Sequence, residues 1–163
     1  MIVYHGSTEI IKNPDVIHSK KYLDFGKGFY ITSFENQAKK WAIRKGMRQQ
    51  KSAIVNVYEL TEDWSCLNVL SFEKENEKWL DFVCSCRKGI ELNQEYDIII
   101  GNVADDDVFK TVDMYFKGIW DKKKVLEELR YYKLNNQICI VNQETLNKVL
   151  SFQKAYEVKD YGK

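Results

Sequence analysis

The stretch Asp24-Phe25-Gly26-Lys27-Gly28-Phe29-Tyr30-Ile31-Thr32 passes from a glycine-containing loop into a short run of large apolar residues. Two glycines one residue apart can cradle a phosphate, although G-x-G alone is a weak signal. Phe29 to Ile31 has the character of a short buried strand. Aromatic residues that leave such a loop are commonly only core, but Tyr30 and the downstream Trp41 could sandwich an aromatic base by stacking. We therefore expect a loop and then a buried strand here.

A helix is expected directly after this strand. Apolar residues, including Ala38 and Trp41, recur at helical spacing from about Phe34 to Gln49. Thr32 and Glu35 fit a capping box, in which the hydroxyl and the carboxylate satisfy the first free N–H groups. The segment is also strongly basic. Such a basic run is usually a solvated face, although beside a nucleotide pocket it could also steer phosphate or nucleic acid. The basic residues of this segment are Lys39, Lys40, Arg44, Lys45, Arg48 and Lys51.

Short strands and helices are scattered over the rest of the chain. Hydrophobic patterning predicts strands at 2–4, 54–60, 96–101, 137–141 and 151–158, of which 96–101 would be central and 151–158 at an edge. Helices are predicted at 73–87, 108–116, 122–132 and 144–150. Because the order lacks a regular βαβ alternation, the fold class is α+β. A chain of 163 residues without a linker is expected to form a single domain, 1–163.

Composition excludes several classes of function. The formal charge of +1 gives no global field that would attract nucleic acid or an anionic membrane. With no readable signal peptide and no apolar stretch of bilayer length, we expect a soluble, cytoplasmic protein without a membrane partner. The four cysteines include one C-x-C, Cys84 and Cys86, and the only histidines are His5 and His18. A zinc site is therefore not expected, and no metal is assigned.

Tyr4-His5-Gly6-Ser7 ends the first predicted strand. A glycine after an edge histidine allows a ligand to approach the backbone, which suits recognition of a planar carboxamide. His5 and Ser7 would offer donors to ribose hydroxyls. The alternative is that His5 merely caps the strand and Gly6 makes a turn.

Gln137 stands at the start of a late predicted strand, within Asn135-Asn136-Gln137-Ile138-Cys139-Ile140-Val141. A polar side chain at a buried strand position needs a hydrogen-bonding partner, and a ligand hydroxyl can be that partner. Asp105-Asp106-Asp107 precedes a predicted helix. Capping explains this run most simply, with a catalytic carboxylate or a cation site as alternatives.

These segments resemble, in sequence order, the His-Tyr-Glu pattern of the diphtheria-toxin and poly-ADP-ribose-polymerase type of ADP-ribosyltransferase. More closely, the chain resembles a bacterial family of unknown function placed in that clan. The resemblance covers Tyr4 to about Phe152 and is carried by YHGS, DFGKGFYIT, QAKKWA, YDIIIGNVADDD and NNQICIV. It implies a single compact ADP-ribosyltransferase-like domain, with short-stranded split sheets flanked by helices and NAD as co-substrate.

The resemblance also implies a role for each matching residue. His5 would bond a ribose of NAD, Tyr30 would line the nicotinamide face and Gln137 would replace the catalytic glutamate. Gly6 would hold the nicotinamide amide through its backbone, and Lys27 would screen the pyrophosphate. The implied catalytic residues are His5, Tyr30 and Gln137, and the implied NAD-binding residues are Tyr4, Gly6, Ser7, Lys27, Gly28, Phe29 and Trp41.

Gln137 is the departure from the pattern. Glutamine keeps the hydrogen bonds of glutamate but has no charge to stabilise an oxocarbenium-like transition state and cannot act as a base. The expected function is therefore mono-ADP-ribosyl transfer to a protein or nucleic-acid acceptor with release of nicotinamide. The resemblance further suggests a toxin held in check by a small antitoxin protein. The alternatives are an NAD glycohydrolase and a non-catalytic module that binds NAD or ADP-ribose.

Overall fold

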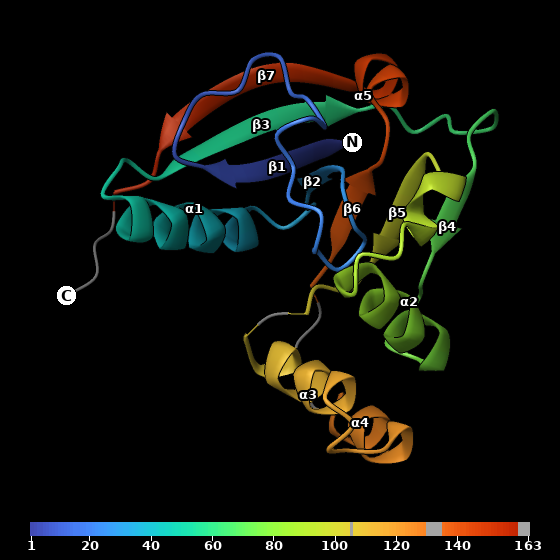
Figure 1. The fold of residues 1–163 in the computed structure, drawn as a ribbon. Coiled ribbons are helices and arrows are strands. Elements are labelled where there is room, and N and C mark those ends of the chain that lie inside the picture. Colours follow the sequence, from blue (N-terminus) through green and yellow to red (C-terminus); the bar gives the residue numbers. More distant parts are fainter. Residues whose placement is uncertain (105, 130–134, 160–163) are drawn as a thin grey trace.

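In the residues that the structure describes, 1–104, 106–129 and 135–159 of a computed structural model, the strands form two small sheets (Figure 1). The first sheet is antiparallel and has the order β1-β3-β7, from strands Ile2–Ser7, Ile54–Leu60 and Leu150–Glu157. The second has the order β2-β6-β5-β4, from strands Phe29–Ile31, Gln137–Ile140, Ile98–Gly101 and Val69–Ser71. Its β4 and β5 pair in parallel, and its other pairs are antiparallel.

Helices cover the sheets unevenly. The helix α1, Glu35–Gln49, packs against β1 and β3, and α2, Glu77–Arg87, lies beside the second sheet with the 3₁₀ turn Leu92–Glu95 after it. The helices α3, Asp106–Phe116, and α4, Lys122–Leu129, pack on each other and project away from the first sheet (Figure 1). The short α5, Gln143–Val149, connects β6 to β7. This arrangement confirms the predicted α+β class.

The second sheet is buried on both faces, which explains the continuous apolar run of β5. Ile98 packs in a cluster with Val3 and Tyr58 of the first sheet. Its neighbour Ile99 points the other way, into a cluster with Trp79 of α2, since successive strand side chains alternate between faces. The core is therefore shared between the two sheets on one side and between the second sheet and α2 to α4 on the other.

One antiparallel bridge joins the sheets. The Tyr4 N–H donates to the Thr32 carbonyl at 2.8 Å, and the Thr32 N–H donates back to Tyr4 at 2.9 Å. Continued pairing would place Gly6 opposite Tyr30, but no backbone hydrogen bond joins these two described residues, and the Tyr30 carbonyl oxygen instead lies 2.6 Å from His5 Nδ1. The two sheets thus part directly after the bridge, and both His5 and Tyr30 line the cleft that follows.

Most predicted elements are confirmed, and β5 is internal and β7 at an edge as expected. The helix α2 begins four residues later than the predicted 73, because the Asn76 side chain caps it by accepting from the Trp79 N–H at 3.0 Å. The strand β4 and the 3₁₀ turn were not predicted. Asp105 and residues 130–134 of the predicted 122–132 helix lie outside the described residues.

The predicted capping box of α1 is wrong. Phe34 is the residue before the helix, and no side chain caps its first turn. Thr32 instead accepts from the Phe34 N–H at 3.1 Å and donates to the Asn136 side chain at 2.8 Å. Glu35 is bonded by the hydroxyl of Tyr156 and paired with Lys39. Tertiary partners on β7 and beside β6 therefore take both groups that the local motif would have used.

Within the described part of the chain, no helix is both long and apolar enough to cross a bilayer.

Candidate active site

Two adjoining hollows occupy the split between the sheets. The Gln137 pocket has a volume of about 330 Å³ and contains His5, Tyr30, Trp41 and Gln137 in its wall. The Arg48 pocket has a volume of about 550 Å³ and is lined by the loop before β2 and by the end of α1. Both volumes lie in the range of about 300–1,000 Å³ that is usual for small-molecule sites. The residues that line both pockets are His5, Leu23, Tyr30 and Lys45.

His5 fills the point at which the two sheets separate. Its Nδ1 lies 2.6 Å from the Tyr30 carbonyl, and its ring stacks on Phe29 with centroids 4.7 Å apart. Because a carbonyl only accepts, Nδ1 carries the proton and Nε2 is an acceptor. Burial lowers the pKa of His5 to about 4, with a further lowering by Lys45, while the bond to Tyr30 opposes the shift. His5 is therefore a neutral acceptor at physiological pH.

Gly6 presents its backbone to the cleft. The Tyr4 N–H and C=O point to Thr32, so the same groups of Gly6, two residues on, also point away from β3. The Gly6 carbonyl accepts from Lys45 Nζ at 2.9 Å. The lack of a side chain has another cause, because a Cβ at Gly6 would lie 2.3 Å from the Ala38 carbonyl oxygen. The glycine is required for the close packing of α1 and leaves an open backbone edge as a result.

The side chain of Tyr30 lines the cleft, and its hydroxyl is hydrogen-bonded to the loop before β2. The hydroxyl donates to the Gly26 carbonyl at 2.6 Å and accepts from the Phe25 N–H at 3.1 Å. Burial raises the pKa of Tyr30, and the neighbouring Cys139 and Asp24 raise it further. Tyr30 therefore stays protonated and serves as a fixed aromatic wall, with Trp41 of α1 in the same pocket.

Gln137 is 4% exposed, at the start of β6. Its Nε2 donates to Asp24 Oδ2 at 2.9 Å and to the Asn102 carbonyl at 3.2 Å. Both N–H bonds of the amide are thus engaged by protein acceptors, and no residue that the structure describes hydrogen-bonds the amide oxygen of Gln137, which lines the pocket.

Lys45 is the cation at the junction of the two pockets. It comes from α1, and burial lowers its pKa, as do the nearby Arg48 and Lys20. Besides the carboxylate of Asp15, which is bonded to His18, the Arg48 pocket continues from Lys45 with further basic and hydroxyl groups, which suit a phosphorylated ligand. These groups belong to Ser7, Thr8, His18, Ser19, Lys20 and Arg48.

The structure brings most of the predicted site residues to this cleft. His5, Gly6, Tyr30, Trp41 and Gln137 line the Gln137 pocket. Ser7, Gly28 and Phe29 line the Arg48 pocket. A Cβ at Gly28 would lie 2.4 Å from Cys139 Sγ, so this glycine, too, is needed for close packing.

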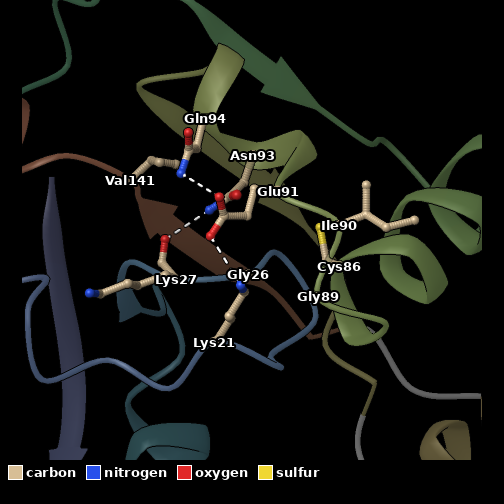
Figure 2. A pocket seen from close by; sticks show the side chains of 10 residues that line it. All are labelled: Lys21, Gly26, Lys27, Cys86, Gly89, Ile90, Glu91, Asn93, Gln94 and Val141. Carbon is tan, nitrogen blue, oxygen red and sulfur yellow. Dashed lines mark hydrogen bonds and ion pairs between the residues drawn. The ribbon is translucent and has the colours of Figure 1, made fainter.

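Two predicted NAD-binding residues lie elsewhere. The Tyr4 side chain packs in the cluster beneath α1, with Ala38 and Ala42. Lys27 is exposed and borders a separate hollow of about 90 Å³, where its carbonyl accepts from Asn93 Nδ2 at 2.9 Å (Figure 2). Figure 2 shows the polar groups around this hollow bonded to one another, including Gln94 to Glu91. This hollow is too small for a nucleotide.

Sequence reasoning missed three charged residues of the Gln137 pocket: Asp24, Lys45 and Arg87. Asp24 lies in the loop 24–28 and Lys45 in the basic run of α1, but neither local pattern predicts a role for its residue. Arg87, at the end of α2, gave no signal. Their convergence depends on long-range packing that no local pattern contains.

The carboxylates of the Asp105 to Asp107 run lie outside the described residues, so the alternatives stated for them stay predictions. Among the side chains that the structure does describe, no cluster of three or more His, Cys, Asp or Glu residues could hold a metal ion.

Residues 1–152 match the family DUF3990, whose description is a protein of unknown function. The chain belongs to this family. A comparison with curated proteins finds no match. The matched region of this DUF3990 chain contains every residue that lines the two pockets, together with all strands except the end of β7.

Proposed function

We propose that this protein is an NAD-dependent mono-ADP-ribosyltransferase. The observation that carries the proposal is the convergence of His5, Tyr30 and Gln137, from β1, β2 and β6, on one pocket at the split between the sheets. The three residues are distant in sequence and stand in the order of the ADP-ribosyltransferase pattern that the chain resembles.

The Gln137 pocket has the groups that a nicotinamide-ribose unit needs. Tyr30 and Trp41 offer aromatic surfaces for the ring, and the outward N–H and C=O of Gly6 match a carboxamide. A carbonyl has two lone pairs, so the Gly6 oxygen can accept from the carboxamide as well as from Lys45. His5 Nε2 and Gln137 Oε1 are both acceptors, as hydroxyl recognition on the ribose requires.

The reaction would break the bond between nicotinamide and ribose, and positive charge would develop on the ribose ring. Groups help only where they favour that state over intact NAD. The lone pairs of His5 and Gln137 do so by their partial negative charge. Nicotinamide leaves as a neutral molecule, so no acid is needed to release it.

The Arg48 pocket would hold the adenosine diphosphate part. Lys45 lies where the two pockets meet, so a ligand that spans both passes its ammonium group. An ammonium group pairs well with diphosphate oxygens. Because Gln137 cannot act as a base, single transfer is favoured over chain elongation.

The proposed function extends to a partner. The resemblance to toxins encoded beside a small partner gene suggests that an antitoxin protein inhibits the transfer. The acceptor of the ADP-ribose would be a protein or a nucleic acid.

The decisive experiment incubates the purified protein with NAD labelled in the adenosine part and a cell lysate. Label in a macromolecule together with free nicotinamide supports transfer. Free ADP-ribose as the sole product indicates a glycohydrolase, and calorimetric NAD binding without nicotinamide release indicates a binding module. Absence of NAD binding rejects the proposal.

Variants assign the activity to the cleft. His5→Ala is expected to weaken NAD binding, and Gln137→Ala to lower turnover more than affinity. Lys40→Ala, an exposed change on α1, is the control that leaves NAD consumption unchanged. Unaltered consumption by both cleft variants would contradict the assignment.

A further inference from the structure

Asp24 has no role in the function proposed above, yet its carboxylate is the most extensively bonded group of the Gln137 pocket. Oδ1 accepts from Arg87 Nε at 3.0 Å and from Nη2 at 2.6 Å. Oδ2 accepts from Gln137 Nε2 at 2.9 Å and from the Ala104 N–H at 3.1 Å. The side chains of Arg87 and Asp24 are only 13% and 11% exposed.

These bonds determine how the Gln137 amide is oriented. Its nitrogen faces two acceptors, Asp24 Oδ2 and the Asn102 carbonyl. If the amide were flipped, its oxygen would face both acceptors and two hydrogen bonds would be replaced by repulsion. Asp24 and Asn102 therefore fix the amide nitrogen, and the amide oxygen, which no described residue hydrogen-bonds, is the group that remains for a ligand in the pocket.

We propose that Asp24 is a positioning residue that presents the Gln137 oxygen to a ligand hydroxyl and that excludes a carboxylate at position 137. The first half rests on the proposed function, because it assumes that the ligand is the ribose of NAD. The second half is a statement about the folded protein alone. In this pair the negative charge is on the Asp24 carboxylate, which binds the amide nitrogen of the neutral Gln137.

The exclusion of a carboxylate follows from the charges that face position 137. With Gln137→Glu, a second carboxylate would stand about 2.9 Å from Asp24 Oδ2, in the place of the amide nitrogen. Arg87 already binds the opposite oxygen of Asp24, and Lys45 is bonded to Gly6. Two carboxyl groups this close share one proton, so the introduced group would have a raised pKa. Among the residues that the structure describes, the titratable groups around the pocket are His5, Tyr22, Asp24, Tyr30, Lys45 and Arg87.

The test compares melting temperatures of four proteins, the wild type, Gln137→Glu, Asp24→Asn and Asp24→Asn/Gln137→Glu, from pH 5 to pH 8. An acid whose pKa is higher in the folded state than in the unfolded chain destabilises the fold as pH rises through that value. The melting temperature of Gln137→Glu is therefore expected to fall relative to that of the wild type as the pH rises from 5 to 8. In the double variant this fall should be much smaller, because the amide introduced at position 24 would donate to the new carboxylate.

Either of two results would overturn the inference: a pH dependence of Gln137→Glu equal to that of the wild type, or an equal loss in the double variant. If Asp24→Asn does not fold because Arg87 is left unpaired, the same comparison is made in an Asp24→Asn/Arg87→Gln background. These measurements need no NAD, so they test the exclusion of a carboxylate independently of the proposed activity.

A second readout tests the positioning role. At pH 7.5, NAD turnover by the double variant should exceed that of Gln137→Glu by about tenfold, since a single oriented polar group is worth that much or more. Equal turnover by the two variants would reject the positioning role, even where the melting curves support the exclusion. If no protein of the set binds NAD, the proposed function fails while the charge coupling is still measured.

Discussion

His5 is held in one protonation state by its surroundings. Because its pKa of about 4 lies below the ordinary value of 6.5, the unfolded chain binds a proton more readily than the folded protein between these values. The contribution of His5 to stability is therefore complete above pH 6.5 and is lost as pH falls toward 4. A proton would also remove the Nε2 lone pair on which the proposed ribose contact depends.

NMR titration of the imidazole signals tests this prediction. The chain has two histidines, so a His18→Gln variant assigns the signals directly. We expect the His5 signal to show no protonation between pH 8 and pH 5.5. A midpoint above pH 6 for His5 would contradict the description of the site.

Lys45 is expected to supply affinity for the diphosphate. Lys45→Met keeps the apolar stem and removes the charge, and we expect NAD binding to weaken about tenfold, ~1.4 kcal/mol. The weakening should shrink at high salt, because the lost interaction is ionic. Calorimetry at two salt concentrations measures both effects. Lys40→Met is the matched control on the same helix, and a similar loss in this variant would point to general charge attraction.

At the scale of the elements, the contact between β1 and α1 sets the shape of the cleft. A Cβ at Gly6 would lie 2.3 Å from the Ala38 oxygen and 2.7 Å from the Ala42 nitrogen, so Gly6→Ala must displace α1. We expect a loss of about 1–3 kcal/mol in the free energy of unfolding. NAD binding should fall as well, since α1 carries Trp41 and Lys45.

Denaturant unfolding and calorimetry check this pair of effects. Gly118→Ala is the control, because a Cβ there meets nothing within 4 Å and only its φ of 71° is strained. That variant should lose some stability and no NAD affinity. Full affinity in Gly6→Ala would mean that α1 does not shape the pocket.

The loop before β2 forms one wall of the Arg48 pocket and is anchored by a buried side chain of β3. Asn56 Oδ1 accepts from the Ile11 N–H at 2.7 Å, and Asn56 Nδ2 donates to the Glu9 carbonyl at 3.0 Å. Asn56→Asp keeps the size of the side chain but sets an acceptor against the Glu9 carbonyl. We expect faster hydrogen exchange at Ile11 and weaker NAD binding.

The control for this prediction is Asn36→Asp, the same change at an exposed position of α1. Its exchange and binding should match the wild type. Unchanged exchange at Ile11 in Asn56→Asp would show that Asn56 does not hold the loop.

At the scale of the whole molecule, the shared core predicts that the two sheets unfold together. Val3 and Leu60 of the first sheet pack in one buried cluster with Ile138 and Ile140 of the second. Separation of the sheets would expose this cluster, at about 25 cal/mol for each Å² of apolar surface. Thermal melts followed by far-UV and near-UV circular dichroism should therefore coincide. Two separate transitions would contradict this prediction and the expectation of a single domain.

The sequence predicted the elements whose formation depends on local patterns of apolar and polar residues. The strand at 29–31 was predicted from a short apolar run, and the strand at 54–60 and the basic helix from hydrophobic periodicity; the structure contains all three. The predicted capping box at Thr32 is wrong because the side chains of Thr32 and Glu35 are hydrogen-bonded to Asn136 and Tyr156, from distant segments, instead. The start of α2 was misplaced because capping by Asn76 was not recognised.

The site was predicted only in part, for a related reason. A pattern spread over the chain predicted His5, Tyr30 and Gln137, which line one pocket, whereas Asp24 and Arg87 reach this pocket through contacts between distant segments that no local pattern contains. Lys27 was chosen for its place in a glycine-rich loop, and the turn of that loop directs it outward, away from the cleft.

The two sheets diverge from the bridge between Tyr4 and Thr32. The width of the cleft then depends on the angle between the sheets, which the side chains packed between them help to set. Leu146 and Val149 of α5 lie in the buried cluster between the two sheets, and neither residue lines either pocket. We expect a change of side-chain volume there to alter how far the sheets diverge, and so the width of the cleft, with every lining residue intact.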